Sequence, residues 1–334
     1  MNIEPLYFSM GILDPLYTAF GFIMRVLYDV FSNFGIVIIL FTIMLRAFMI
    51  PLGVKQFKGT IKQQGMSKEL EDIKRRYGNN KEEMQKAQQA LYAKTGFSPL
   101  SGCLPSIVQL IIIWPVYRII SAPLVHISGV PIENITGENG LGKIASELGL
   151  ISENVLKQIE RMNIPIVNAL NDSPAFLSRA LTEGLIKIDQ LLDLRFLGMN
   201  LGLNPTWKPE LLFGDQMSVY LPLIVIPILS VTTTFLSMKI TQWTAPNRKK
   251  LLEEKERAKK NPAKNSQEAP DPTAGMTKSM TWFMPLFTLW ISFTLPAAMG
   301  LYWIVGNIMM MAQQFLLYNL ITKRTETKIV EVSK

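Results

Sequence analysis

The stretch FGIVIILFTIMLRAFMIPLG, residues 34–53, decides the fold class of this chain. Twenty residues in a helix rise about 30 Å, which matches the hydrocarbon core of a bilayer. Most of the residues in this stretch are apolar, and the only charged one is Arg46. The stretch is therefore predicted to be a membrane-spanning helix that carries one intramembrane cation.

Four further stretches have a comparable apolar length. They cover residues 104–122, 217–238, 280–296 and 298–320. Apolar residues make up 49% of the whole chain, and the mean hydropathy is +0.22, which is more apolar than an ordinary soluble domain. The sequence therefore predicts an all-α polytopic membrane protein with five transmembrane helices.

Two polar segments flank the first span. Residues 1–33 contain an apolar run at 16–30 in which Arg25 and Asp29 lie four positions apart. This pattern predicts an external amphipathic helix at the membrane surface, and a buried extra span is the alternative. Residues 54–100 are predicted to form a cytoplasmic αα-hairpin, because helical apolar spacing recurs on both sides of Gly78-Asn79-Asn80.

Three segments separate or follow the later spans. Residues 123–216 form a long external insertion, with a helix expected from 172 to 192 and extended chain at 195–202. Residues 239–279 are predicted to be a flexible cytoplasmic loop, because their centre is rich in proline, amides and charge. Residues 321–334 form a short cytoplasmic tail.

Basic residues set the predicted orientation. Residues 54–100 and 239–279 each carry ten Lys and Arg against five Asp and Glu, and the tail 321–334 carries four against two. The insertion 123–216 carries seven basic and eleven acidic residues, and residues 1–33 carry one and three. Positive segments stay in the cytoplasm. The N-terminus is therefore predicted outside and the C-terminus inside.

The sequence lacks the residues that several kinds of enzyme and metal site require. Cys103 and His126 are the only cysteine and the only histidine, which leaves no pair for an internal disulfide and no Cys or His cluster for a metal. His-Glu-x-x-His, Gly-x-Ser-x-Gly and glycine-rich phosphate loops are absent from the sequence. The start of the chain has no features of a cleaved signal peptide. We therefore expect no enzyme activity, no cofactor and no metal.

Arg46 is the strongest candidate for a functional residue. It lies five residues before Pro51, about 7–8 Å from the inner end of its span. An intramembrane guanidinium is costly and is by default a functional hypothesis, although snorkelling to the interface is the alternative. No predicted span contains Asp or Glu, so the sequence predicts an unpaired cation in a water-containing cavity. Such a cation would suit transient binding of acidic or polar groups.

Other polar residues inside the spans are predicted to line the same cavity. They are Thr42, Ser106, Gln109, Thr288, Ser292, Asn307, Gln313 and Gln314. For each one alone, a hydrogen bond between two helices is the alternative.

Three blocks of the sequence resemble the YidC/Oxa/Alb insertase family, in its Gram-positive type. The blocks are FGIVIILFTIMLRAFMIPLGVKQ (34–56), GFSPLSGCLPSIVQLIIIWPVY (96–117) and MTWFMPLFTLWISFTLPAAMGLYWIVGNIMMMAQQFLL (280–317). The likeness covers roughly 14–122 and 195–320. The insertion 123–194 is longer than this type has, and the resemblance gives it no role.

The resemblance implies a fold and a function. Five helices would surround a hydrophilic groove that contains Arg46. The protein would be an insertase and chaperone in the bacterial cell membrane, and it would move client transmembrane segments into the bilayer without nucleotide hydrolysis. Its partners would be newly made membrane proteins and lipid, with the ribosome, the signal recognition particle and the Sec translocon as further candidates and no DNA. The hairpin would receive the client through apolar residues, namely Phe57, Ile61, Ile73, Tyr77, Met84 and Leu91.

Two other functions stay open from the residues alone. A transporter or channel could use Arg46 as an anion site, but such proteins usually show repeated halves and this sequence shows none. The lysines of 54–100 and 239–279 could contact RNA, although topology determinants commonly have this composition.

Overall fold

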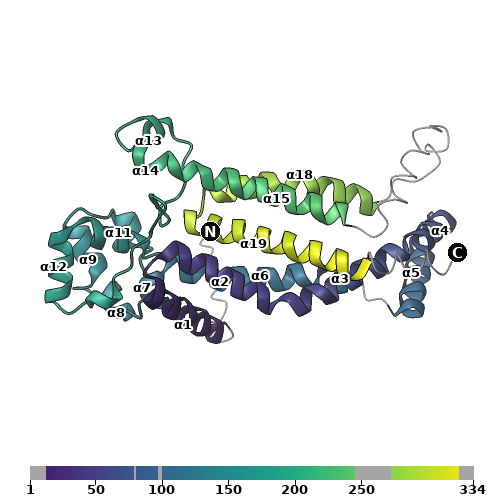
Figure 1. Cartoon of the computed structure of the whole chain (residues 1–334), viewed down its shortest axis with the longest axis horizontal. Helices are drawn as coiled ribbons and strands as arrows, with labels where there is room; N and C mark the ends of the chain where they lie inside the picture. Colours follow the sequence, from purple (N-terminus) through teal and green to yellow (C-terminus); the bar gives the residue numbers. More distant parts are fainter. Residues whose placement is uncertain (1–12, 79, 97–99, 245–271, 323–334) are drawn as a thin grey trace. The chain divides into compact units, whose positions relative to one another are not determined.

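The computed structural model describes residues 13–78, 80–96, 100–244 and 272–322, and these residues are mostly helical (Figure 1). The chain divides into two compact units. Unit 1 comprises Met1–Met44, Leu110–Ser230 and Leu289–Val305, and unit 2 comprises Leu45–Gln109, Val231–Thr288 and Gly306–Lys334.

Five long helices each contribute residues to both units. They are α2 (Phe34–Phe48), α6 (Leu100–Ser121), α15 (Val225–Trp243), α18 (Pro272–Ser292) and α19 (Ala297–Leu317).

These helices differ in whether they are long and apolar enough to cross a bilayer. Met217–Trp243 and Ala297–Ile321 are each long and apolar enough to cross a bilayer. Phe34–Phe48 and Ile50–Gly59 pass together if they form one span with a 52° bend. The described residues therefore contain two clear candidate spans, or three if this bent pair forms one span, and the five-span topology stays a prediction.

The remaining elements are shorter. Unit 2 adds α3 (Ile50–Gly65), α4 (Ser67–Tyr77), α5 (Lys81–Thr95) and a π-helical turn, η4 (Tyr318–Thr322). Unit 1 adds α1 (Asp14–Phe31), α7 (Pro123–His126), α8 (Ile132–Thr136), α9 (Leu141–Glu147), α10 (Glu153–Leu156), α11 (Ile164–Asp172), α12 (Pro174–Thr182), η2 (Ile188–Gln190), β1 (Arg195–Phe196), β2 (Met199–Asn200), α13 (Pro209–Phe213), α14 (Met217–Tyr220) and η3 (Pro222–Ile224).

Residues 123–216, the predicted insertion, fold around their own apolar core. Their short helices direct apolar side chains inward, and Leu141, Ile166, Val167 and Phe176 are fully buried. Apolar residues at helical spacing on α9, α11 and α12 supply this core, because burying them removes apolar surface from water. The two-stranded hairpin that follows pairs Arg195 with Asn200.

The helix predicted for 172–192 is shorter in the structure. The Ser173 side chain accepts a hydrogen bond from the Phe176 amide at 3.3 Å and so caps α12. The helix ends at Thr182, and Gly184 then adopts a left-handed conformation with φ of +70°. The prediction is therefore wrong beyond Thr182, because a left-handed glycine ends a helix.

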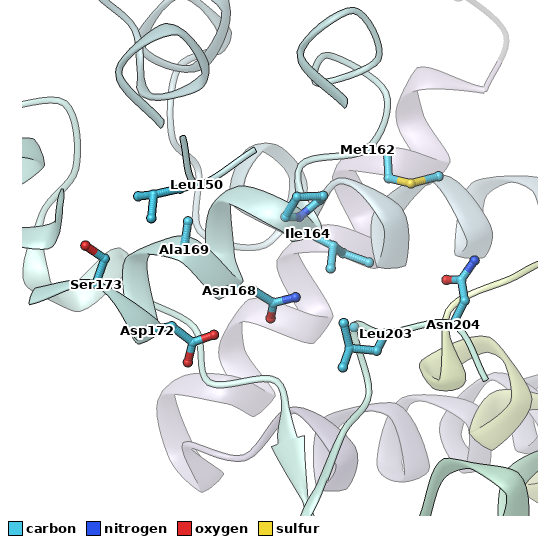
Figure 2. A pocket seen from close by; sticks show the side chains of 11 residues that line it. Leu150, Met162, Ile164, Asn168, Ala169, Asp172, Ser173, Leu203 and Asn204 are labelled. Carbon is cyan, nitrogen blue, oxygen red and sulfur yellow. The ribbon is translucent and has the colours of Figure 1, made fainter. Parts of the chain in front are cut away.

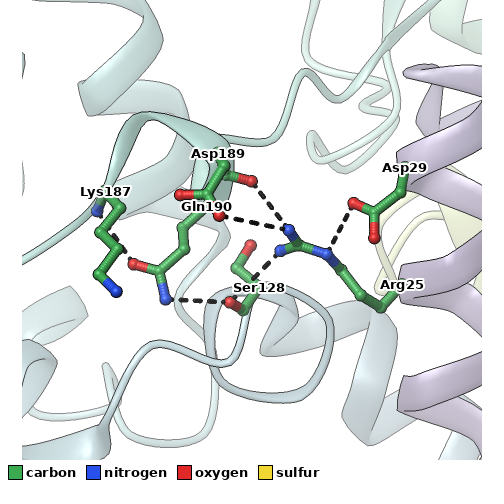
Figure 3. A network of polar contacts seen from close by, with 6 residues as sticks. All are labelled: Arg25, Asp29, Ser128, Lys187, Asp189 and Gln190. Atoms are coloured by element: carbon green, nitrogen blue, oxygen red, sulfur yellow. Dashed lines mark hydrogen bonds and ion pairs between the residues drawn. The ribbon is translucent and has the colours of Figure 1, made fainter.

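A polar network attaches α1 to the insertion (Figure 3). Arg25 Nε lies 2.8 Å from the Asp29 carboxylate, and Arg25 Nη2 donates to the Asp189 carbonyl at 3.2 Å. Gln190 Nε2 donates to the Ser128 carbonyl at 3.2 Å, and Arg25 Nη1 donates to the same oxygen at 3.5 Å. One side chain on α1 therefore bridges η2 and the loop that follows α7.

The two faces of α1 differ in their surroundings. Tyr28 is buried, and its hydroxyl accepts a hydrogen bond from the Asp193 amide at 2.7 Å. On the opposite face Phe22, Val26 and Val30 are exposed. This is the pattern of a surface helix with one face on protein and a second apolar face free for another apolar phase. Its placement on the membrane surface stays a prediction.

Candidate functional site

Arg46 lies on the last turn of α2, just before the chain changes direction. The helix ends at Phe48, α3 begins at Ile50, and the two axes differ by 52°. Pro51 has no amide hydrogen to donate, and its ring crowds the preceding turn, which accounts for the bend.

The Arg46 side chain lies against the backbone of α19. A Cβ atom added to Gly306 would lie 2.9 Å from Arg46 Nη2 and 3.4 Å from its Nε. Glycine at this position therefore leaves the space that the guanidinium fills. Gly306 has no charge or polar side chain, so its role was missed; the only sequence signal is a small residue within a span of bulky ones.

The prediction that Arg46 is unpaired is wrong. The half-buried guanidinium has an interaction partner within the protein. Because the low dielectric of an apolar environment makes an unpartnered charge costly, a partner is what physical chemistry requires there.

A second polar contact joins α19 to α15. Asn307 is 8% exposed, and its Nδ2 donates to Thr234 Oγ1 at 2.9 Å and to Thr233 Oγ1 at 3.2 Å. Two turns later, Gln314 Nε2 donates to Thr244 Oγ1 at 2.9 Å. For these two predicted cavity residues, the helix–helix hydrogen bond is therefore the observed contact.

Residues seven apart divide the polar side of α19 into two stripes. Asn307 and Gln314 are both directed to α15. Gly306 faces Arg46, and the Gln313 amide occupies the place that a Cβ on Gly53 of α3 would take. Seven residues are almost two complete turns, so each pair lies on one face of the helix. One stripe thus meets α15, and the other meets Arg46 and α3.

Two of the remaining predicted cavity residues form hydrogen bonds within their own helices. Thr42 is fully buried, and its hydroxyl bonds back to the carbonyl one turn earlier on its own helix, as does that of Thr288. Ser292 is buried and Gln109 is half-buried. The Ser106 side chain lies outside the described residues. Thr42 and Ser292 belong to unit 1, and Arg46, Gln109, Thr288, Asn307 and Gln314 belong to unit 2.

The helical hairpin keeps part of its apolar surface exposed. Phe57 on α3 is buried, and the other predicted client-receiving residues are half-buried: Ile61, Ile73, Tyr77, Met84 and Leu91. α4 packs against α5, and Asn80 caps α5 by accepting a hydrogen bond from the Glu83 amide at 3.3 Å. No residue of α5 is fully buried.

The insertion contains a pocket of about 410 Å³, shown in Figure 2. Its lining comes from α11, from the loops around it and from the segment after β2, and consists of Leu150, Met162, Ile164, Pro165, Asn168, Ala169, Asp172, Ser173, Gly202, Leu203 and Asn204. Asp172 pairs with Arg195 at 3.1 Å, and Asn200 donates to Asn168 at 2.9 Å, so polar contacts brace two sides of the pocket. None of the residues predicted for the site lies here.

No candidate metal site is present in the described part of the chain. Those residues include no group of three or more His, Cys, Asp or Glu side chains that could hold an ion.

Comparison with known proteins gives one family and many relatives. The family model described as "60Kd inner membrane protein" matches residues 26–325. The chain is 22% identical over 296 residues to "Membrane protein insertase YidC" of Caldanaerobacter subterraneus subsp. tengcongensis, covering 89% of this chain and 90% of that protein. It is 22% identical over 318 residues to "Membrane protein insertase MisCA" of Bacillus subtilis, covering 94% and 80%.

Other relatives are longer and more similar over a shorter stretch. "Membrane protein insertase YidC" of Treponema pallidum is 34% identical over 117 residues, which is 35% of this chain. The matched part spans only 19% of that protein's length.

Proposed function

The chain belongs to the 60Kd inner membrane protein family, and from this membership we propose that it is a membrane protein insertase. Relatives that carry this name align with nearly its whole length. It is a bacterial membrane protein with helices apolar enough to span a bilayer. Newly made membrane proteins are the clients, and the protein acts as their chaperone during insertion.

One observation carries the proposed mechanism: the Arg46 guanidinium lies against Gly306 among apolar helices. A polar tail that crosses the bilayer must leave water, which is costly without compensating groups. Arg46, with Gln109, offers such groups within a proposed hydrophilic groove. The attraction between Arg46 and an acidic tail lowers the barrier to entry.

The groove releases its client as readily as it accepts it. Arg46 already has a partner within the protein, so a client competes for the guanidinium and is not held permanently. The apolar client helix gains by moving into lipid, and this transfer supplies the driving force without nucleotide hydrolysis. The half-buried apolar side chains of α4 and α5 are proposed to meet the client first. The ribosome, the signal recognition particle and the Sec translocon are candidate partners that deliver it.

Reconstitution tests the proposal. The purified chain is placed in liposomes with a short client that has an acidic N-terminal tail, and protease protection of that tail is measured without nucleotide. Chain-dependent protection is expected. Arg46→Ala should reduce it about tenfold, and Arg46→Lys should retain most of it because it keeps the charge. Arg179→Ala, which removes an exposed arginine of the insertion, is the matched control.

The outcomes test the insertase activity and the role of Arg46 separately. Protection that does not depend on the chain would refute the insertase. Full protection with Arg46→Ala would refute the role of the guanidinium and leave the family membership untouched. Anion flux through the same vesicles without protection would favour the transporter in which Arg46 is an anion site.

A further inference from the structure

The segment between the insertion and α15 exposes large apolar side chains. Trp207 is 64% exposed and Phe213 is 73% exposed, and Met217 and Leu221 are exposed as well. Water-facing surfaces rarely carry so many large apolar groups within a short stretch. They point to another apolar phase as the partner of this segment.

The length of the adjoining helix indicates the depth of this segment in the membrane. Met217–Trp243 contains 27 residues, which rise about 40 Å, whereas the hydrocarbon core is about 30 Å thick. At the far end, Trp243 lies 6.4 Å from Phe315 and 5.8 Å from Tyr318, between ring centroids, and such aromatic groups mark a membrane interface. A helix needs about 20 residues to cross the hydrocarbon core. Counting about 20 residues back from Lys239, the charged residue near the far end of this helix, places the other edge of the core near Val219.

A second set of contacts places Trp207 independently. Its ring packs edge-on against Phe293, with centroids 5.1 Å apart, and Phe293 directly follows the last residue of α18. Asn204 Nδ2 donates to the Thr294 carbonyl at 3.0 Å, and the Ala297 amide donates to the Leu203 carbonyl at 2.9 Å. The segment is thus tied to the connection between two apolar helices.

The residue types suit the boundary between lipid headgroups and acyl chains. Indole rings prefer this region because they combine an apolar body with one N–H donor. Lys208, Glu210 and Asp215 interleave with the apolar residues and are exposed, so they can remain in the headgroup layer.

We propose that residues 207–221 bind the surface of the lipid bilayer, with Trp207 and Phe213 inserted at the headgroup boundary of the leaflet opposite the basic loops. This membrane contact lies on the side of the insertion and adds a second lipid-binding surface to the one expected of α1. It does not depend on the insertase activity, and its test requires no client.

The first test measures depth at Phe213. A nitroxide is attached to Phe213→Cys in a Cys103→Ser background, in vesicles of phosphatidylcholine and phosphatidylglycerol. Collision with oxygen is expected to exceed collision with a water-soluble nickel chelate severalfold. Leu148→Cys is the matched control, because Leu148 is an exposed apolar residue at the end of α9 and should favour nickel. Equal nickel access at both positions, or low collision with both reagents at Phe213, would overturn the proposal.

The second test needs only the native tryptophan. The emission of the intact protein minus that of Trp207→Phe isolates Trp207. In vesicles with brominated lipids, this difference should be quenched at least twofold more by bromine near the headgroup than by bromine at the acyl-chain end. An unquenched difference spectrum with the emission maximum of water-exposed indole would refute the membrane contact.

Discussion

At the scale of single residues, the space beside a charge matters as much as the charge. Arg46 could be singled out from the sequence because it interrupts an apolar run. Gly306 could not, because its contribution is the absence of a side chain next to the guanidinium. Arg46 supplies the charge of the candidate site, and Gly306 leaves the space in which that charge lies.

We expect Gly306→Ala to displace the Arg46 guanidinium, because the added methyl would lie 2.9 Å from Nη2, and this displacement to offset the stabilisation of about 1 kcal/mol that alanine gives a helix over glycine. In an Arg46→Ala background the same change should be neutral or stabilising, because alanine favours helix over glycine by about 1 kcal/mol. Thermal unfolding of the four proteins in detergent forms a double-mutant cycle. Additive effects would show that the two residues do not touch.

His126 gives the fold a predictable response to acid. Its ring stacks on Tyr17 with centroids 5.6 Å apart, and burial, with a smaller contribution from Arg118, lowers its pKa to about 4. Between about pH 6.5 and 4 the unfolded chain therefore binds a proton that the folded chain does not, and stability falls as pH falls. The loss should stay below about 3 kcal/mol, because the ring is partly exposed.

The acid response is measured as the shift in Tm between pH 7 and pH 4.5. His126→Phe keeps an aromatic ring and removes the titration, so its Tm should fall less over this range than that of the unchanged protein. Identical shifts in the two proteins would assign the acid response to other groups.

At the scale of elements, α19 works as a helix with two polar stripes. The stripe of Asn307 and Gln314 fixes its packing on α15, and the stripe of Gly306 and Gln313 meets Arg46 and α3. Register matters because the two stripes are offset by a single residue. A rotation of about 100° would exchange them.

Asn307→Leu should therefore destabilise the contact between α15 and α19 by about 1 kcal/mol, the usual size of a hydrogen bond between helices in a membrane. Thr233→Val combined with Thr234→Val should cost a similar amount and should add little to Asn307→Leu. Met310→Leu is the control, because Met310 is exposed. Chemical unfolding in mixed micelles measures the differences, and fully additive costs would contradict the shared contact.

The attachment of α1 depends on a different element contact. Arg25→Gln removes the charge that bridges Asp29 and Asp189, and it should speed amide hydrogen exchange in α1 severalfold. Arg179→Gln breaks the 2.7 Å ion pair between Arg179 on α12 and Glu183, which follows the helix, and should leave α1 unchanged. Equal exchange of α1 in both variants would show that the apolar face around Met24 and Tyr28 holds the helix alone.

At the scale of the whole molecule, charge decides orientation and apolar length decides what crosses the bilayer. The basic segments predict a cytoplasmic hairpin and an external insertion. In a Cys103→Ser background, Lys81→Cys should stay protected from an impermeant maleimide in intact cells, and Asn139→Cys should react. Both replaced side chains are exposed in the structure. Reaction at Lys81→Cys with protection at Asn139→Cys would invert the topology.

The sequence by itself determined the helical membrane class, the candidate spans and the choice of Arg46. A span must match the thickness of the hydrocarbon core, and a charge within it is costly, so both features can be recognised along the chain. The sequence also placed the short strands near Arg195. The tertiary structure alone decided that Gly306 receives the guanidinium and that Thr233 and Thr234 bind Asn307. These features depend on which faces of distant segments meet, and composition along the chain carries no record of that distance in space.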